Sequence, residues 1–369
     1  MWNWQHKDWP EFVYDPEEFS GYENKFLQKS GIMLGSMKHI TEEDQATLKV
    51  NLISDEAFKT SEIEGDILDR DSLQSSIKKQ FGLQSDNRKI SPAEQGVAEM
   101  MVDVYQNFQT PIDLDLLFNW HQMLMSGRRD LQVIGGYRIH SEPMQVVSGP
   151  VNRPAVHFEA PPFEKIPEEI DRFIEWFNRT RAGGPQELPG LLRSGIAHLY
   201  FESIHPFEDG NGRIGRGISE KVLSQSLARP TLIAISTTIE AHKKAYYLAL
   251  HRASAGLEIS DWLHYFCKMV LNAQDRTQSM IDFLIEKGKY YQAYMDQLND
   301  RQAKVVERMF REGISGFEGG LSAKNYLSIT GTTRATATRD LQSLVEMGAF
   351  TRTGKRKYTR YFLNIDMNR

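Results

Sequence analysis

Residues 205–216 read HPFEDGNGRIGR and interrupt a long run of helical sequence. Pro206 disfavours helical backbone at the preceding residue, so we expect one helix to end at His205. Gly210-Asn211-Gly212 permits a tight turn with left-handed backbone, after which a second helix is expected to begin. The stretch therefore predicts two helices joined by a polar loop, with Phe207 as the apolar side chain that holds the loop down.

The same loop has the features of an anion site that also does chemistry. A helix N-terminus offers free N–H groups and the positive end of the helix dipole. Arg213 and Arg216, three residues apart, emerge on one face of the second helix and suit a polyphosphate. Asp209 suits a Mg²⁺ ion that bridges phosphate oxygens, and a neutral His205 suits a general base. A turn signal or a lone histidine by itself would favour a structural role, but the combination favours a site.

At every fixed position HPFEDGNGRIGR resembles the Fic family motif, HxFx(D/E)GNGRxxR, and the resemblance extends over residues 40–290. Fic proteins typically transfer AMP from ATP to a hydroxyl of a target protein. The resemblance thus implies ATP and Mg²⁺, His205 as the base for a Ser, Thr or Tyr hydroxyl, and Asp209 as the metal ligand. It implies that Arg213 contacts the β-phosphate and Arg216 the γ-phosphate. The whole implied set of ATP- and phosphate-binding residues is Phe207, Glu208, Asp209, Gly210, Asn211, Gly212, Arg213 and Arg216.

A second informative stretch is TSEIEG, residues 60–65. Thr60 and Glu64 are four residues apart and share one face of a predicted helix. The stretch resembles the inhibitory motif (S/T)xxxE(G/N) of the Fic family, here Thr60, Glu64 and Gly65, in which the glutamate pairs with the second arginine of the catalytic motif, Arg216. A carboxylate there would neutralise the γ-phosphate clamp. A solvated, glutamate-rich helix is the alternative, and removal of AMP with the help of the same glutamate stays open.

Two further stretches resemble parts of Fic proteins that border the substrates. Val156, His157, Phe158 and Glu159 resemble a flap hairpin that aligns a target segment by strand pairing, although a plain surface hairpin around Gly149-Pro150 is the alternative. Tyr246 and Tyr247 resemble aromatic residues beside the adenine, whereas a core position is the alternative. Ser254 stands where some relatives have a nucleotide-contacting asparagine.

The whole chain reads as a mainly α protein with one β excursion. Its 369 residues are long enough for two or three domains, and 40% of them are hydrophobic, which is typical of globular proteins. The only cysteine, Cys267, excludes an internal disulfide framework. With no secretory signal and no long apolar run, we expect a cytoplasmic protein without a membrane partner. The expected segments are an aromatic-rich cap at 1–40, a helical region with the inhibitory helix at 41–110, a Fic core at 111–295 and a winged helix at 296–369.

The last segment has its own charge and its own pattern. The chain carries a net charge of −5, yet residues 351–369 hold six basic side chains and one acid. Helix, turn and helix signals around Gly331, followed by a two-stranded run, match the order of a winged helix. This favours DNA as a partner, and protein docking is the alternative. The candidate DNA contacts are Arg334, Arg339, Lys355, Arg356, Lys357 and Arg360.

The sequence as a whole predicts a Mg²⁺- and ATP-dependent adenylyltransferase that modifies a hydroxyl of a target protein or of itself, restrained in cis by Glu64. Transfer of another nucleoside monophosphate or of phosphate is an alternative, because a phosphate-binding site does not specify the nucleobase of the nucleotide. A DNA-binding regulator whose core senses nucleotide is a rival of another class. A homodimer is also left open.

Overall fold

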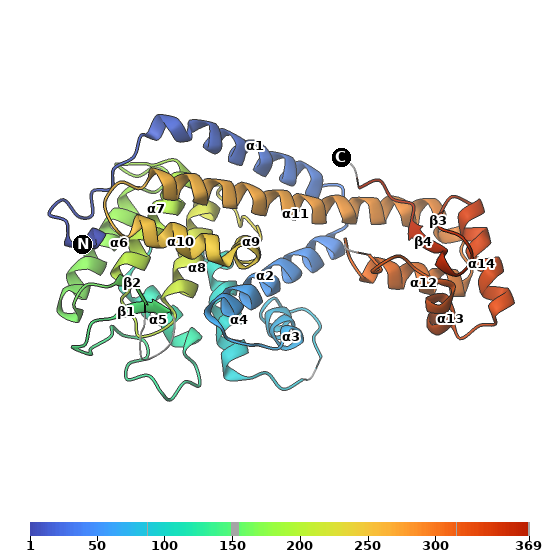
Figure 1. Ribbon diagram of the computed structural model, residues 1–369, viewed down its shortest axis with the longest axis horizontal. Coiled ribbons are helices and arrows are strands. Elements are labelled where there is room, and N and C mark those ends of the chain that lie inside the picture. Colours follow the sequence, from blue (N-terminus) through green and yellow to red (C-terminus); the bar gives the residue numbers. More distant parts are fainter. Residues whose placement is uncertain (87, 149–154, 315, 368–369) are drawn as a thin grey trace. The chain divides into compact units, whose positions relative to one another are not determined.

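The computed structural model describes residues 1–86, 88–148, 155–314 and 316–367 and confirms a mainly helical protein with a small β-hairpin (Figure 1). The helices are α1 (Ser20–Met37), α2 (Glu42–Glu64), α3 (Arg70–Gln80), α4 (Pro92–Gln106), α5 (Leu114–Leu124), α6 (Ile166–Arg179), α7 (Gly190–Ile204), α8 (Asn211–Ser226), α9 (Ile235–Ala241), α10 (Lys243–Ala253), α11 (Ser260–Tyr294), α12 (Asp300–Arg311), α13 (Ala323–Thr330) and α14 (Arg334–Glu346). The strands are β1 (Gln145–Ser148), β2 (Ala155–Glu159), β3 (Phe350–Thr353) and β4 (Arg360–Leu363).

The chain folds into two compact units that do not follow the four segments expected from the sequence. One unit comprises residues 1–31 and 49–276, and the other comprises residues 32–48 and 277–369. The long helix α11 begins in the first unit and ends in the second, so the boundary expected at 295 and 296 lies just beyond its end. None of the described helices combines the length and apolar character that crossing a bilayer requires.

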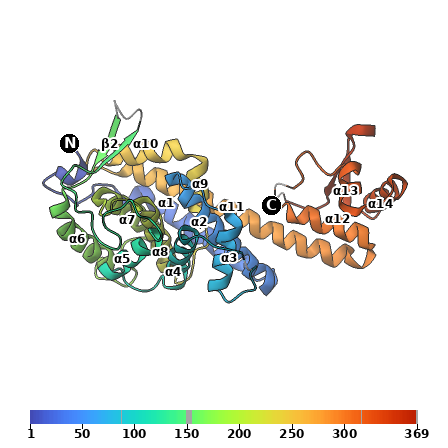
Figure 2. The same ribbon diagram turned by 90° about the horizontal axis from the view of Figure 1, so that it is seen from below.

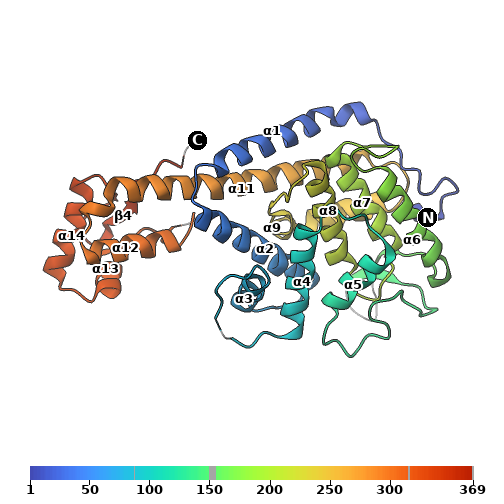
Figure 3. The same ribbon diagram turned by 180° about the vertical axis from the view of Figure 1, so that it is seen from behind.

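The first unit is organised around α7 and α8, which pack against each other along their length. Figure 3 shows them side by side, with α6 next to α7 and α4 next to α8. Almost every residue of α7 is buried, and α8 is buried from Asn211 to Ser224. Two central helices with almost no exposed face need neighbours on all sides, and this keeps the loop between them in place.

The helices around this pair begin where their sequences say they should. Ser91 caps α4 through a capping box with Glu94, and Pro92 occupies the first turn. Asp113 caps α5 by accepting a hydrogen bond from the Leu116 backbone N–H at 2.8 Å. Trp120 of α5 is wholly buried, and its indole N–H donates to Asp103 of α4 at 2.6 Å. The caps and this bond fix α4 and α5 beneath the polar loop.

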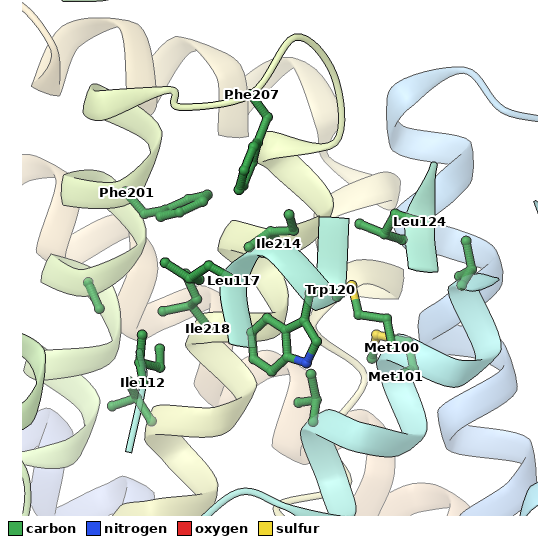
Figure 4. Packing of buried hydrophobic residues seen from close by; sticks show 14 of the residues in the cluster. Met100, Met101, Ile112, Leu117, Trp120, Leu124, Phe201, Phe207, Ile214 and Ile218 are labelled. Atoms are coloured by element: carbon green, nitrogen blue, oxygen red, sulfur yellow. The ribbon is translucent and has the colours of Figure 1, made fainter. Parts of the chain in front are cut away.

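Phe207 is the plug that the sequence predicts for the loop. Only 1% of it is exposed, and its ring stacks on His121 of α5 with 4.2 Å between centroids. Figure 4 shows Phe207 above Phe201 and Ile214, at the top of the apolar cluster that contains Trp120. The loop is therefore tied to the core of the unit by one aromatic side chain.

The second unit has a core of its own, which joins the last turns of α11 to α12, α13, α14 and β3. The antiparallel strands β3 and β4 pair from Phe350–Leu363 to Thr353–Arg360, and Leu321 adds an isolated bridge to Tyr361. The order of these elements is the order expected of a winged helix, and that assignment stays an interpretation.

Replacing the plug tests the role given to Phe207 in the first unit. We expect Phe207→Ala to lower the free energy of unfolding by about 3–5 kcal/mol, the usual cost of a large cavity in a packed core. Ile67→Ala is the control, because 97% of Ile67 is exposed. Urea unfolding monitored by tryptophan fluorescence measures both variants, and equal losses would contradict the role of Phe207.

Candidate active site

His205 lies at the end of α7, as Pro206 predicts, and adopts left-handed backbone with φ 51°. Arg138 holds this turn: its Nε donates to the His205 carbonyl at 2.9 Å, and its Nη2 donates to the Pro161 carbonyl at 2.5 Å. A non-glycine residue with positive φ stores strain, which surrounding contacts must maintain. The buried Arg138 supplies those contacts and aims the imidazole into the site.

The His205 imidazole has a pKa lowered to about 4, first by burial and then by the nearby Arg138 cation. It is therefore neutral near pH 7, as a general base must be. Its Nδ1 is buried, and within the described part of the chain no hydrogen-bond partner satisfies that atom. Glu202 Oε2 lies 4.0 Å from Nδ1. With the proton on Nδ1, the lone pair of Nε2 is free to accept a proton from a substrate.

The first turn of α8 is open to a ligand. Gly210 precedes the helix with φ 85°, and it offers no side chain to cap the first N–H groups. Asn211 closes the loop instead, with Oδ1 accepting from the Phe207 N–H at 3.0 Å and Nδ2 donating to the Phe207 carbonyl at 2.9 Å. The free N–H groups and the positive end of the helix dipole make an anion cradle here.

Three residues that the sequence analysis placed among the phosphate contacts hold the loop in place. Phe207 is the buried plug, and the side-chain amide of Asn211 is hydrogen-bonded to the Phe207 backbone. Glu208 accepts hydrogen bonds from the Gln132 and Val133 N–H groups at 2.9 and 2.8 Å. The Asn211 amide and Glu208 Oε2 are used within the fold, and Phe207 is buried, so a phosphate contact by any of these three residues stays a prediction.

Arg216 is a buried cation, 2% exposed, and it is held by the end of α2. Its Nη2 donates to Glu64 Oε1 at 2.7 Å and to the Thr60 carbonyl at 2.9 Å, while its Nε donates to the Thr60 hydroxyl at 2.7 Å. Burial disfavours the cation, but the Glu64 carboxylate, Tyr246 and Tyr247 together keep the pKa of Arg216 above its ordinary value. This is the pairing that the resemblance of TSEIEG to the inhibitory motif implies. That the pair inhibits the protein stays a prediction.

The Glu64 carboxylate also occupies the mouth of the anion cradle. A Cβ atom added to Gly212 would lie 2.2 Å from Glu64 Oε1 and 3.1 Å from Arg216 Nη1. Arg216 Nη1 is buried and, among the described residues, has no acceptor. An anion on the turn at Gly212 would meet this unused donor but would have to displace Glu64.

A second carboxylate, which the sequence analysis missed, holds the other arginine. Arg213, 3% exposed, donates from Nη1 to Asp66 Oδ2 at 2.6 Å. Asp66 is placed by the end of α2: Gly65 takes φ 92°, and the Asp66 N–H donates to the Ser61 carbonyl at 3.0 Å. A carboxylate directly after the glycine of TSEIEG was the available signal.

Asp209 is the expected metal ligand, and it is ion-paired on both oxygens. Arg128 Nη1 donates to Oδ2 at 2.8 Å, and Arg213 Nη2 donates to Oδ1 at 3.2 Å. Burial opposes ionisation, but Arg213 and Arg128 together keep the pKa of Asp209 below its ordinary value. The described residues contain no cluster of three or more metal-binding side chains, so substrate phosphates would have to supply most of the ligands.

The expected hairpin is present as β1 and β2, beside α10 in Figure 2, and the turn at Gly149-Pro150 lies outside the described residues. Phe158 pairs with Val146 and is flanked by His157 and Glu159, of which Glu159 pairs with Gln145 of β1. The carbonyls of His157 and Glu159 already accept hydrogen bonds, from His251 Nδ1 and from Trp4 Nε1 respectively. Val156 is 39% exposed. β2 is thus braced by side chains rather than open for pairing.

Of the three residues expected beside an adenine, only Tyr247 presents an exposed ring, 37% accessible. Tyr246 is buried, and its hydroxyl is hydrogen-bonded to His198 Nε2 at 2.7 Å. Ser254 is also buried and donates to the His251 carbonyl at 2.9 Å. An adenine contact therefore stays a prediction for Tyr247, while the other two side chains face the protein interior.

Comparison with known proteins gives two matches to family models. The model of the Fic/DOC family matches residues 111–223, which include α7, the loop and most of α8. A second model, described as a domain of unknown function (DUF4172), matches residues 2–83, which include TSEIEG.

Among curated proteins, the chain is similar to protein adenylyltransferase fic-1 of Caenorhabditis briggsae, with 31% identity over 156 residues, or 42% of the chain. That match spans only 28% of the nematode protein. Among solved structures, a Fic family protein from Desulfovibrio desulfuricans G20 aligns with a TM-score of 0.55 at 21% identity, covering 96% of this chain and 98% of that one. A Fic domain containing signaling protein from Bacteroides thetaiotaomicron aligns with a TM-score of 0.52 at 19% identity, covering 73% and 98%.

Glu202 makes the site sensitive to pH. Burial, and then the Glu64 carboxylate, raise the pKa of Glu202 from 4.5 to about 8. Between these values the folded protein holds a proton that the unfolded chain has released, so this residue lowers stability as pH rises through that window. We therefore expect Glu202→Gln to raise the melting temperature above that of wild type, and to raise it more at about pH 8 than at about pH 5. The difference between the two pH values corresponds to a few kcal/mol of unfolding free energy, since one pKa unit is worth about 1.4 kcal/mol.

Thermal melts of both proteins at the two pH values measure this difference. Glu175→Gln is the control, since the side chain of Glu175 is 74% exposed. The same shift at both pH values would contradict a buried, protonated Glu202.

Proposed function

The chain belongs to the Fic family, and on that premise we propose that it is a protein adenylyltransferase, which transfers AMP from ATP to a hydroxyl of a target protein or of itself. We propose further that it is held inactive by the end of α2. The nematode relative named protein adenylyltransferase supports the activity, although the chain spans under a third of that protein.

The observation that carries the proposal is one anion cradle with a neutral base at one side and two buried arginines at the other. His205, the Gly210–Gly212 turn, Arg213 and Arg216 meet at the junction of α7 and α8. Both arginines are already bound by carboxylates, Asp66 and Glu64. Carboxylates in those positions mimic the charge of phosphates, so the nucleotide and the inhibitory segment would compete for the same donors.

In the proposed reaction the target hydroxyl oxygen attacks the α-phosphorus of ATP. The hydroxyl proton passes to Nε2 of His205 as the new P–O bond forms. The bond from the α-phosphorus to the bridging oxygen breaks, and pyrophosphate leaves with that electron pair. Arg213 and Arg216 hold the β- and γ-phosphates and stabilise the charge that develops on them. The imidazolium returns its proton to solvent.

A Mg²⁺ ion at Asp209 would neutralise charge between the phosphate oxygens. The Asp209 carboxylate is ionised and is held at the edge of the cradle by Arg128 and Arg213. Asp209 is the residue that would hold the ion, and Arg128 and Arg213, which now pair with it, would have to share or release the carboxylate.

We propose that the target segment pairs with β1 rather than with β2. On β2, the backbone carbonyls of His157 and Glu159 accept hydrogen bonds from His251 and Trp4. The ring of Trp2 also packs on Phe158 of this strand, at 5.5 Å between centroids. Within the described part of the chain, no side-chain hydrogen bond to a backbone carbonyl of β1 would compete with a strand added to its edge.

The activity is tested with Glu64→Gly and labelled ATP. We expect auto-modification to rise at least about tenfold over wild type, because the change frees the Arg216 guanidinium for the γ-phosphate and a tenfold rate corresponds to only about 1.4 kcal/mol. Mass spectrometry should detect an AMP adduct that disappears in Glu64→Gly/His205→Ala. Parallel reactions with GTP, CTP and UTP distinguish transfer of another nucleotide, and incubation of modified protein without ATP detects removal of AMP. Equal activity of Glu64→Gly and wild type would overturn the inhibitory role.

Removing the charge of Asp66 should also favour nucleotide binding, but by a smaller amount than removing the charge of Glu64. We expect Asp66→Asn to tighten binding of a non-hydrolysable ATP analogue with Mg²⁺ by about two- to fivefold, since Asp66 is 41% exposed and exposed ion pairs are worth up to about 1 kcal/mol. Glu64→Gln should have the larger effect, because both arginines are buried but the side chain of Glu64 is less exposed, 26% against 41% for Asp66. Calorimetric titration measures both. Glu62→Gln removes a carboxylate of the same helix turn that pairs with Lys59 instead, and a matching gain in this control would show that Asp66 acts only through overall charge.

A further inference from the structure

The second unit ends in a module whose charges are distributed unevenly. Within it, α13 and α14 are joined by a short turn in which Gly331 takes φ 66° and Thr333 caps α14. The strands β3 and β4 follow, bridged to Leu321. On α14 the buried residues Ala337, Leu341 and Leu344 face the core of the unit. The opposite face of the helix is exposed.

The exposed face of α14 carries the side chains that read base edges. Its exposed residues from the first turn onward include Arg334, Ala335, Thr338, Arg339 and Gln342. Arginine suits the acceptors of guanine, glutamine suits adenine, and alanine or the methyl group of threonine suits the methyl group of thymine. The face has no acid before Glu346, and Glu346 lies in the last turn, where it accepts a hydrogen bond from Gln342.

The one acid in the middle of α14 is turned inward and is neutralised there. Asp340, 5% exposed, accepts from Arg301 Nε at 2.8 Å and from the Tyr326 hydroxyl at 3.0 Å. This bond network joins α12, α13 and α14 in the interior of the module. It fixes the orientation of α14 and keeps a negative charge away from its exposed arginines.

Ion pairing differs among the basic residues of the module: the arginines of α12 are paired, whereas Lys304 of α12 and Lys324 of α13 are exposed and have no ion pair among the described residues. On α12, Arg301, Arg308 and Arg311 each pair with an acid. Among the residues that the structure describes, no ion pair involves the basic side chains of α14, of β3 or of the segment after β3: Arg334, Arg339, Arg352, Lys355 and Arg356. These side chains are exposed, and the side chain of Lys357 lies outside the described part of the chain. Like charges gathered without partners repel one another, and a polyanion relieves that repulsion.

We propose that this surface binds double-stranded DNA, with α14 in the major groove and the loop between β3 and β4 on the phosphate backbone. An α-helix fits the major groove of B-form DNA, whereas the deep, narrow major groove of double-stranded RNA excludes side chains. The uncompensated charge supplies affinity for phosphates, and the exposed polar face of α14 supplies base contacts. This binding is a property of the second unit and goes beyond the transferase activity proposed for the first.

The test uses the full chain and fluorescence anisotropy with a short labelled DNA duplex of mixed sequence, over a series of KCl concentrations. We expect the logarithm of affinity to fall linearly with the logarithm of salt, with a slope of about −0.9 per phosphate neutralised. The variant Arg352→Ala/Lys355→Ala/Arg356→Ala should weaken binding and make the slope shallower by about 1 for each phosphate that is no longer neutralised. Arg311→Ala removes an equally exposed arginine of α12 that is paired with Glu307, and it should leave binding unchanged.

Two outcomes would overturn the proposal. Absence of binding at low salt, with wild type and triple variant alike, would leave the surface to a protein partner. Equal binding of a double-stranded RNA of the same length would make the surface a general polyanion site and remove α14 from the groove. Selection of preferred duplexes from a random pool, followed by Arg339→Ala, separates base contacts from phosphate contacts: loss of preference with the salt slope retained is the expected result. Equal thermal melts of all variants exclude misfolding.

Discussion

A buried guanidinium that must always have an anion governs this site. Arg216 is 2% exposed, and leaving such a charge without a counter-charge costs several kcal/mol. Glu64 and the Thr60 oxygens satisfy it in this structure. Any ligand that replaces Glu64 must bring at least equivalent negative charge to the same donors. A polyphosphate meets that condition, and a neutral ligand does not. The requirement gives the cradle two self-consistent states, one closed by carboxylates and one filled by phosphates.

Arg213, like Arg216, pairs with a carboxylate from the end of α2, and this second pair follows from the local geometry of that helix. The helix ends at Glu64, Gly65 turns the chain with φ 92°, and Asp66 returns its N–H to Ser61. Residues 64 and 66 therefore both face α8, one toward each arginine. Since the side chain of Asp66 is 41% exposed and that of Glu64 is 26% exposed, the ion pair of Asp66 with Arg213 is the weaker of the two. A ligand that reaches Arg213 first would meet less resistance than one that reaches Arg216 first.

Much of this could be predicted from residues that are neighbours in the sequence. HPFEDGNGRIGR specified the helix end at His205, the open N-terminus of α8 and the two arginines, because proline, glycine and helical spacing act locally. The pairing of Glu64 with Arg216 came from a family resemblance and not from spacing. Arg138, Arg128 and Glu202 were missed since they reach the site from other elements, through contacts such as the 2.8 Å bond from Arg128 to Asp209. The sequence could not predict that Glu208 and Asn211 hydrogen-bond to backbone groups within the fold, because those partners are set by the tertiary structure.

The remainder of α2 determines how the closed state can open. Ile53 and Ala57 are wholly buried, and the carboxylate of Glu56 accepts two contacts from the Ser236 N–H at 2.8 and 2.9 Å. Pulling the whole helix from α8 would expose this apolar surface and strand a buried carboxyl group, which together cost far more than one ion pair is worth. Moving only the last turn of α2 avoids this cost. The side chain of Glu64 is already 26% exposed, and a Cβ atom added to Gly65 would have nothing within 4 Å. Under the proposed function, release of the cradle would therefore require only rotation or fraying at the end of α2, while Thr60 would stay bound to Arg216 and keep that guanidinium in place.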